Sequence, residues 1–197
     1  MVTPPPERLG ILGGTFDPVH IAHVFSAAEC RAVLRLDRVD LVVAGDPWQK
    51  RGDVVLPAEV RLELVRLAVD GVEGIAASAV EVERPGPTYT VDTLEALASP
   101  GRELFLILGA DLPAALPSWH RSERIRELAT LVVVARAGEQ YAEPPGGGWR
   151  VERVDIPRLD VSSTDIRTRL AAGRPIDGLV PVPVVRRIAI LGLYTPR

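Results

Sequence analysis

The chain has 197 residues, enough for one domain with a sizeable core, and we expect residues 1–197 to form a single domain with a disordered tail at 1–7. A net charge of −3 excludes the basic surface that binds long nucleic acids, and the single cysteine, Cys30, excludes an intrachain disulfide. No apolar stretch could cross a membrane and no signal-peptide core precedes the first strand, so we expect a cytoplasmic location.

Apolar runs alternate with helical patterns along the chain. The runs predict strands at residues 9–12, 38–43, 75–82, 103–108, 130–134 and 150–155. The patterns predict helices at residues 21–34, 57–69, 90–98, 121–128, 163–171 and 182–190. This alternation indicates an α/β fold with a Rossmann-like, doubly wound parallel sheet. Because ligands of such folds bind beyond the carboxyl ends of the strands, the loops that follow three of these strands should converge on one crevice.

A glycine turn followed by two histidines connects the first expected strand to the first expected helix. Residues 13–23 are Gly-Gly-Thr-Phe-Asp-Pro-Val-His-Ile-Ala-His. Backbone N–H groups and the helix dipole attract an anion at such a turn, and His20 and His23, three residues apart, add imidazole donors on one helix face. A lone histidine here would be a structural residue, but two of the chain's three histidines at this spacing favour a phosphate site.

A second anion site is predicted where hydroxyl side chains open the helix at 163–171. Residues 161–167 are Val-Ser-Ser-Thr-Asp-Ile-Arg, in which Ser162, Ser163 or Thr164 could cap the helix. Arg167 follows within the first turn or so and is suited to a bidentate phosphate contact, although it could be a surface arginine. Together, the two helix N-termini predict a polyphosphate held from both sides.

These two motifs resemble those of the nucleotidyltransferase superfamily that carries the (H/T)xxH motif. Four further segments resemble the bacterial nicotinate-nucleotide adenylyltransferases within it: Pro-Trp-Gln-Lys at 47–50, Gly-Pro-Thr-Tyr-Thr-Val-Asp-Thr-Leu at 86–94, Leu-Gly-Ala-Asp at 108–111 with Ser-Trp at 118–119, and Leu-Tyr at 193–194. The Thr-Tyr-Thr segment and Trp119 carry this narrower assignment. The loop ends in Trp-Gln-Lys where many relatives have Pro-His-Lys, and His120 stands where some have tyrosine, which concerns the shape of the nicotinate pocket and not the reaction.

The resemblance implies transfer of AMP from ATP to nicotinate mononucleotide, giving deamido-NAD and pyrophosphate in NAD biosynthesis. The attacking 5′-phosphate is already ionised, so the protein need only position two anions and neutralise developing charge. The catalytic residues implied are His20, His23, Arg167 and the single lysine, Lys50, which could otherwise be an ordinary solvated side chain.

The implied binding residues form two groups. Those expected to bind ATP, besides the histidines and Arg167, are Gly13, Gly14, Thr15, Phe16, Gly109, Asp111, Ser162, Ser163, Thr164 and Ile166. Those expected to bind the mononucleotide are Lys50, Thr88, Tyr89, Thr90 and Trp119, with the tryptophan stacked on the pyridine ring unless it belongs to the core. Asp111 could instead cap a turn.

A Mg²⁺ ion is expected as cofactor, held mainly by ATP phosphates and water and by no protein ligand. Asp17 is accordingly expected to brace the glycine turn and not to bind metal.

Three alternatives share parts of this pattern. Another adenylyl- or cytidylyltransferase, such as the pantetheine-phosphate enzyme, shares both phosphate motifs but lacks the Thr-Tyr-Thr segment. A non-catalytic nucleotide sensor has less need of His20, His23, Lys50 and Arg167. A class I aminoacyl-tRNA synthetase also uses a His-x-x-His turn, but this chain is short for one and has no basic face.

Overall fold

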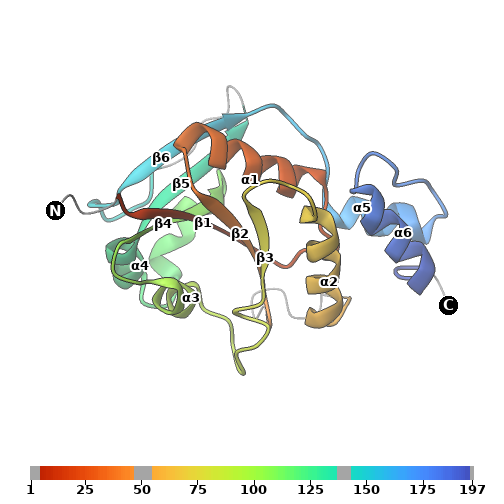
Figure 1. Ribbon diagram of the computed structural model, residues 1–197, viewed down its shortest axis with the longest axis horizontal. Helices are drawn as coiled ribbons and strands as arrows, with labels where there is room; N and C mark the ends of the chain where they lie inside the picture. The colour runs from red at the N-terminus through yellow and green to blue at the C-terminus, as the bar shows by residue number, and fades with distance from the viewer. Residues whose placement is uncertain (1–4, 47–54, 137–142, 196–197) are drawn as a thin grey trace.

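A single parallel sheet organises the computed structural model, which describes residues 5–46, 55–136 and 143–195 (Figure 1). Its six strands lie in the order β3-β2-β1-β4-β5-β6, and each neighbouring pair is parallel. The strands are β1 (Glu7–Gly14), β2 (Arg38–Val43), β3 (Ile75–Ser78), β4 (Arg102–Gly109), β5 (Ala129–Arg136) and β6 (Val151–Ile156). The predicted doubly wound, Rossmann-like sheet is therefore confirmed, and the strand order reverses between β1 and β4, where ligands of such folds bind.

The six predicted helices are present with ends that differ by at most one residue. They are α1 (Ile21–Leu34), α2 (Ala58–Val69), α3 (Thr90–Leu97), α4 (Ser122–Leu128), α5 (Ser163–Ala171) and α6 (Val182–Leu191). The sequence patterns missed a short 3₁₀ helix at Pro113–Ser118, which precedes Trp119. At the N-terminus, β1 begins at Glu7, the last residue of the expected tail.

The predicted strand at residues 75–82 was too long. Among the described residues, β3 pairs with β2 alone, and the last pair in their register joins Ser78 to Val42, next to the end of β2. The described part of the chain offers no partner strand beyond Ser78, and residues 80–83 turn instead. This turn brings Glu81 close to Gly45, just beyond the carboxyl end of β2, because a Cβ atom added to Gly45 would clash with the Glu81 carbonyl oxygen.

Helices cover both faces of the sheet, and strands β2, β4 and β5 bury apolar side chains on both faces. On β4, Phe105 and Ile107 face one core cluster, which also contains side chains of α1, α2, α5 and α6. The alternating residues Leu104, Leu106 and Leu108 face the second cluster, with side chains of α3 and α4. In Figure 1, α5 and α6 lie together at one end of the molecule, beside α2.

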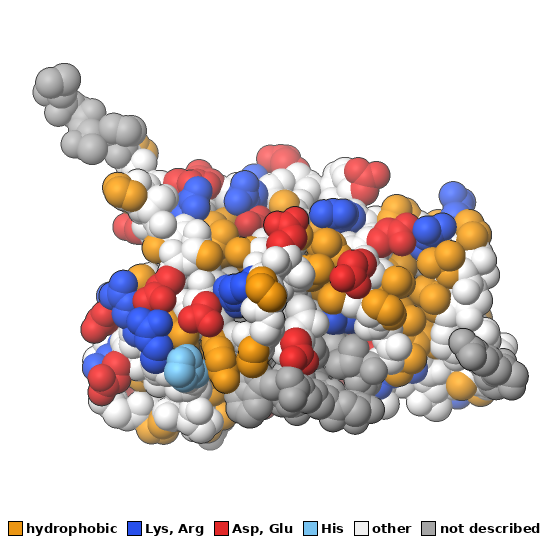
Figure 2. Space-filling model, turned by 90° about the horizontal axis from the view of Figure 1, so that it is seen from below, with side chains coloured by type: hydrophobic (Ala, Val, Ile, Leu, Met, Phe, Trp, Pro, Cys, Tyr) orange, Lys and Arg blue, Asp and Glu red, His pale blue; other side chains and the backbone are white. Residues whose placement is uncertain are grey.

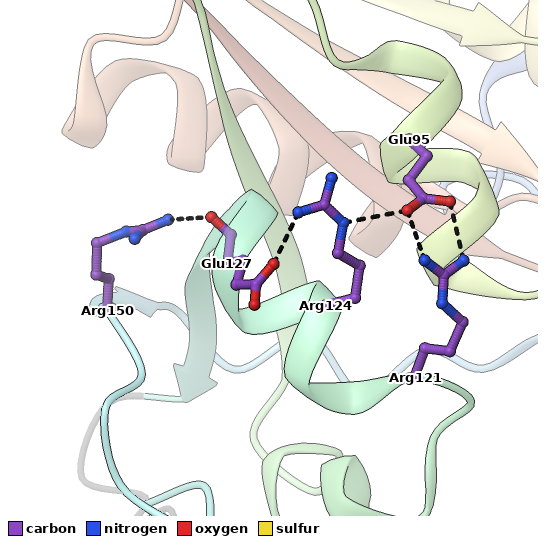
Figure 3. A network of polar contacts seen from close by, with 5 residues as sticks. All are labelled: Glu95, Arg121, Arg124, Glu127 and Arg150. Atoms are coloured by element: carbon purple, nitrogen blue, oxygen red, sulfur yellow. Dashed lines mark hydrogen bonds and ion pairs between the residues drawn. The ribbon is translucent and has the colours of Figure 1, made fainter.

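Ion pairs on the surface join α3 to α4, and a hydrogen bond joins α4 to Arg150, which directly precedes β6 (Figure 3). Both carboxylate oxygens of Glu95 accept hydrogen bonds from Arg121, at 3.0 and 2.8 Å, and one of them also pairs with Arg124. Arg124 pairs in turn with Glu127, whose carbonyl oxygen accepts a hydrogen bond from Arg150. The network holds α4, which follows Trp119, against α3, which begins at Thr90.

Acidic and basic side chains are interspersed on the face shown in Figure 2, so this face has no single-signed patch. Within the described ranges, none of the helices combines the length and the apolar character needed to span a bilayer.

Candidate active site

The turn between β1 and α1 is built around a buried aromatic ring. Phe16 adopts a left-handed backbone conformation, with φ of 52°, and its side chain is buried in the core. The ring packs so closely on Gly14 that a Cβ atom added there would lie 2.8 Å from it. Glycine at position 14 is therefore required by this contact, and the turn can present its backbone to the crevice.

The two histidines lie face to face at the start of α1. His20 precedes the helix, and its backbone N–H donates to Nδ1 of His23 at 3.2 Å. Their rings are stacked, with centroids 3.6 Å apart. We had predicted that both imidazoles lie on one face of the helix. They meet instead through the turn, because His20 precedes the helix and only His23 lies within it. Burial lowers the pKa of His20 to about 4, so its imidazole is neutral at pH 7 in the free protein.

Asp17 braces the turn, as predicted. Its carboxylate is 2% exposed and accepts a hydrogen bond at each oxygen, from Tyr194 Oη at 2.6 Å and from the Val55 backbone N–H at 2.7 Å. Both oxygens are thus occupied by protein donors. The carboxylate joins the turn to the C-terminal tail and to the segment that leads into α2.

The C-terminal helices hold the same turn from the other side. Arg167 donates to the Asp17 carbonyl oxygen at 2.8 Å, and Ser163 Oγ donates to the Pro18 carbonyl oxygen at 2.8 Å. Ser162 caps α5, because its hydroxyl accepts the Asp165 N–H at 3.1 Å. The segment 162–167 and the histidine turn are therefore brought together in space, as the two phosphate motifs predicted.

Arg61 is a central residue that the sequence analysis missed. It is 1% exposed and donates hydrogen bonds to the carbonyl oxygens of Thr15, Ala44, Gly45 and Leu56. These carbonyls belong to the glycine turn, the end of β2 and the start of α2. The sequence did indicate that Arg61 is buried, because it lies four residues before Val65 and seven before Ala68, on the apolar face of α2.

Two adjoining cavities open at the carboxyl ends of β1 and β4. The first has a volume of about 440 Å³, and its lining includes His23, Gly109 and Asp111. The second has a volume of about 260 Å³, and its lining includes Gly13, Gly14, Thr15, Thr88, Thr90 and Trp119. The cavities share a wall formed by Leu12, Ile107, Leu108 and Gly109. The crevice predicted from the loops is therefore present, and it is divided in two.

Several predicted site residues lie outside both cavities. Phe16 and Ile166 are buried in the core, and Tyr89 packs its ring against His120 with centroids 4.5 Å apart. Neither of the two cavities is lined by His20, Ser162, Ser163, Thr164 or Arg167. Lys50 lies outside the described residues, so the structure does not place it.

The second cavity also contains an acidic residue that the sequence analysis did not select. Glu81 lines the cavity and is only 7% exposed, and its carboxyl accepts a hydrogen bond from Thr93 Oγ1. Burial raises the pKa of Glu81 to about 7. Its signal in the sequence was weak, because a glutamate in a turn is ordinarily a solvated residue.

The described residues offer no group of three His, Cys, Asp or Glu side chains that could hold a metal ion. Asp17, the buried carboxylate at the turn, already has a hydrogen-bond donor at each oxygen.

Comparisons with known proteins agree with this architecture. The model of the cytidylyltransferase-like family matches residues 11–169. A protein of Roseiflexus sp. (strain RS-1), described as a probable nicotinate-nucleotide adenylyltransferase, is 46% identical over 193 residues, covering 94% of this chain and 97% of the relative. A protein of Corynebacterium kroppenstedtii with the same description is 44% identical over 96% of this chain and 92% of its own length. The nicotinic acid mononucleotide adenylyltransferase of Plasmodium falciparum, solved in complex with NaAD, superposes with a TM-score of 0.77 at 18% identity, over 95% of this chain and 97% of that one.

The fold and the two motifs define a nucleotidyltransferase, and the chain belongs to the cytidylyltransferase-like family. Within that family it belongs to the nicotinate-nucleotide adenylyltransferases. The family resemblance inferred from the sequence is thereby confirmed.

Proposed function

We propose that the protein transfers the AMP moiety of ATP to nicotinate mononucleotide, giving deamido-NAD and pyrophosphate. The observation that carries this proposal is the pair of adjoining cavities, with His23 in the lining of one and the glycine turn in the lining of the other. Two nucleotides placed in these cavities would direct their phosphates toward the same turn. The relatives, which share 40% or more of their residues with this chain, support the same reaction.

The reaction needs positioning and charge neutralisation. A 5′-phosphate oxygen of the mononucleotide attacks the α-phosphorus of ATP, one P–O bond forms, and the bond to the β-phosphate oxygen breaks. The nucleophile enters as an anion, so no residue has to remove a proton. We assign ATP to the first cavity, with Gly109 and Asp111 beside its ribose, and the mononucleotide to the second, between Trp119 and residues 88–90.

The catalytic groups proposed are His20, His23, Lys50 and Arg167. The two stacked imidazoles would donate N–H groups to the phosphates, and a bound polyphosphate would favour the protonated form of His20, which burial otherwise disfavours. Arg167 would contact the β- and γ-phosphates from α5 while holding the turn through the Asp17 carbonyl. The role of Lys50 rests on the sequence alone.

We retain the backbone of residues 13–16 for the α-phosphate of ATP, which would meet the mononucleotide at this turn, since Gly13, Gly14 and Thr15 line the second cavity. The start of α5 at Ser162, Ser163, Thr164 and Ile166 is retained for the rest of the ATP site. Because the side chain of Ile166 is buried, only its backbone could contribute. In the mononucleotide site Tyr89 would likewise contribute its backbone.

We propose Mg²⁺ as the cofactor, and it would be held by ATP phosphates and water. This assignment fits the chemistry of the residues present, since magnesium retains water ligands and Asp17 already accepts two hydrogen bonds. The metal would offset charge on the pyrophosphate. We further propose that the chain forms one nucleotidyltransferase domain; a cytoplasmic location stays a prediction.

The test is pyrophosphate release with ATP and Mg²⁺, with nicotinate mononucleotide, nicotinamide mononucleotide and phosphopantetheine compared in parallel. We expect release with the nicotinate compound and much slower release with the other two. Faster release with phosphopantetheine would contradict the substrate. If none of the three releases pyrophosphate while ATP still binds, the protein would instead be a non-catalytic nucleotide sensor.

A His20→Ala variant separates catalysis from binding. An enzyme that uses His20 in the transition state should lose kcat by about 100-fold or more while the Kd for ATP changes much less. A Val33→Ala variant is the control, because that side chain lies exposed near the other end of the same helix.

A further inference from the structure

An acidic residue in a pocket for an acidic substrate needs an explanation. Glu81 lines the second cavity together with Thr88, Thr90 and Trp119. Under the function proposed above, these neighbours surround the nicotinate ring. The substrate carries a carboxylate on that ring, whereas nicotinamide mononucleotide carries a neutral amide at the same place.

The Glu81 carboxyl is held in place by neighbouring side chains. Thr93 Oγ1 donates to Glu81 Oε1 at 2.5 Å, and Arg84 donates to Thr93 Oγ1 at 3.2 Å. Thr93 is 1% exposed and also lines the cavity. The chain from Arg84 through Thr93 therefore fixes one oxygen of the carboxyl at the cavity wall.

Near neutral pH, the protonated and ionised forms of Glu81 are both populated. Burial is the largest influence and raises its pKa to about 7. The charged groups that act on it are Arg84, in the same turn, which lowers the pKa, and Asp92, in the first turn of α3, which raises it. The hydrogen bond from Thr93 also favours the ionised form.

A second carboxylate in the same small cavity shifts this balance further. Two carboxylates in one buried site repel each other, so one of them takes up a proton when both are present. Nicotinate is the stronger acid, because its ring bears a positive charge, and the proton therefore goes to Glu81. The amide mononucleotide carries no negative charge on its ring and therefore does not favour protonation of Glu81.

We propose that Glu81 is a specificity-determining residue that accepts the nicotinate carboxylate only in its protonated form, so that the choice between the acid and amide mononucleotides depends on pH. Binding of the acid above neutral pH then takes up one proton from solvent. Preference for the acid is greatest below neutral pH and weakens as Glu81 ionises. This inference rests on the proposed function.

The experiment measures kcat/KM for nicotinate and nicotinamide mononucleotides between pH 6.5 and 8.5. The ratio of the two values cancels the titration of groups that both reactions share, including the 5′-phosphate. In the limit in which only protonated Glu81 accepts the acid, the ratio should fall about 25-fold over this range, since the pKa of Glu81 is about 7.

Two variants and one control assign the effect to this carboxyl. Glu81→Gln should give a ratio that varies less than about twofold with pH, because the amide does not titrate. Thr93→Val removes a hydrogen bond to the ionised form, so the fall should move to higher pH. Glu83→Gln makes the same charge change two residues away, at an exposed position, and should keep the wild-type profile.

The outcomes separate this inference from the function on which it depends. A flat ratio in the wild-type protein, or an equal fall in Glu81→Gln, overturns the role of Glu81 and leaves the adenylyl transfer intact. Absence of product from both mononucleotides refutes the proposed function, and the inference with it. If Glu81→Gln does not fold, the wild-type profile and the shift in Thr93→Val decide the question.

Discussion

The hydrogen bond between Tyr194 and Asp17 should stabilise the fold and the active-site turn together. It joins residues 177 positions apart in the sequence, with Oη and Oδ1 separated by 2.6 Å. Replacing Tyr194 with Phe keeps the ring and removes only the donor. A hydrogen bond to a charged group contributes about 1.5–3 kcal/mol, and the upper half applies here because Asp17 is 2% exposed and water cannot easily take the place of the hydroxyl.

We therefore expect Tyr194→Phe to lower the free energy of unfolding by about 2–3 kcal/mol, which corresponds to a fall in Tm of about 4–12 °C for a chain of this size.

The variant should also be a slower enzyme, because Arg167 donates to the carbonyl oxygen of the same Asp17. The fold-decrease in kcat should exceed the fold-increase in the KM for the mononucleotide. Thermal unfolding and steady-state kinetics of the same samples measure both effects.

Thr195→Ala is the matched control, since the Thr195 hydroxyl donates only to the Gly192 carbonyl oxygen within the tail itself. It should change Tm and kcat little. The reasoning is refuted if Tyr194→Phe and Thr195→Ala behave alike, or if Tyr194→Phe lowers Tm while kcat is unaffected.

We make three other predictions, for substitutions at His20, Arg61 and Trp119. His20 has a pKa of about 4 in the folded protein against an ordinary value of 6.5, so its own contribution to the free energy of unfolding should fall by up to about 3 kcal/mol as the pH drops through this window. Glu81, whose pKa burial raises, contributes in the opposite direction, so the two proteins are compared at each pH: between pH 7 and 4.5 the wild-type protein should lose about 2 kcal/mol relative to His20→Gln in chemical denaturation. Arg61→Met leaves four partly buried carbonyl oxygens without their donor and should cost about 3–5 kcal/mol in chemical denaturation, whereas Arg66→Met, at an exposed position of the same helix, should cost less than about 1 kcal/mol. Trp119→Ala should raise the KM for nicotinate mononucleotide about tenfold with little change in the KM for ATP, because stacking on a base is worth about 1–3 kcal/mol; equal changes in both constants would contradict its place in the second cavity.

Local patterns in the sequence were sufficient for the fold. The alternation of apolar runs and amphipathic helices determines a parallel sheet, because each run must be buried on both faces and each helix on one. The ends of α1 and α5 agreed with prediction to the residue. A hydroxyl residue, Ser162, marks the start of α5, whereas α1 begins after His20 and ends before Arg35. The prediction was wrong for β3, whose end depends on the length of its partner strand β2.

The phosphate motifs were also accessible from the sequence, because backbone turns and helix starts are local structures. The sequence alone therefore determined the fold, the family and the positions of the two motifs. Only the tertiary structure decided which side chains face a cavity, placing the Ile166 side chain in the core and Glu81 in the second cavity. It also decided that Arg61, Asp17 and Tyr194 support the turn. The physical reason is that burial and the partners of a polar group depend on segments distant in the chain, and these set both the pKa of Glu81 and the two hydrogen bonds of Asp17.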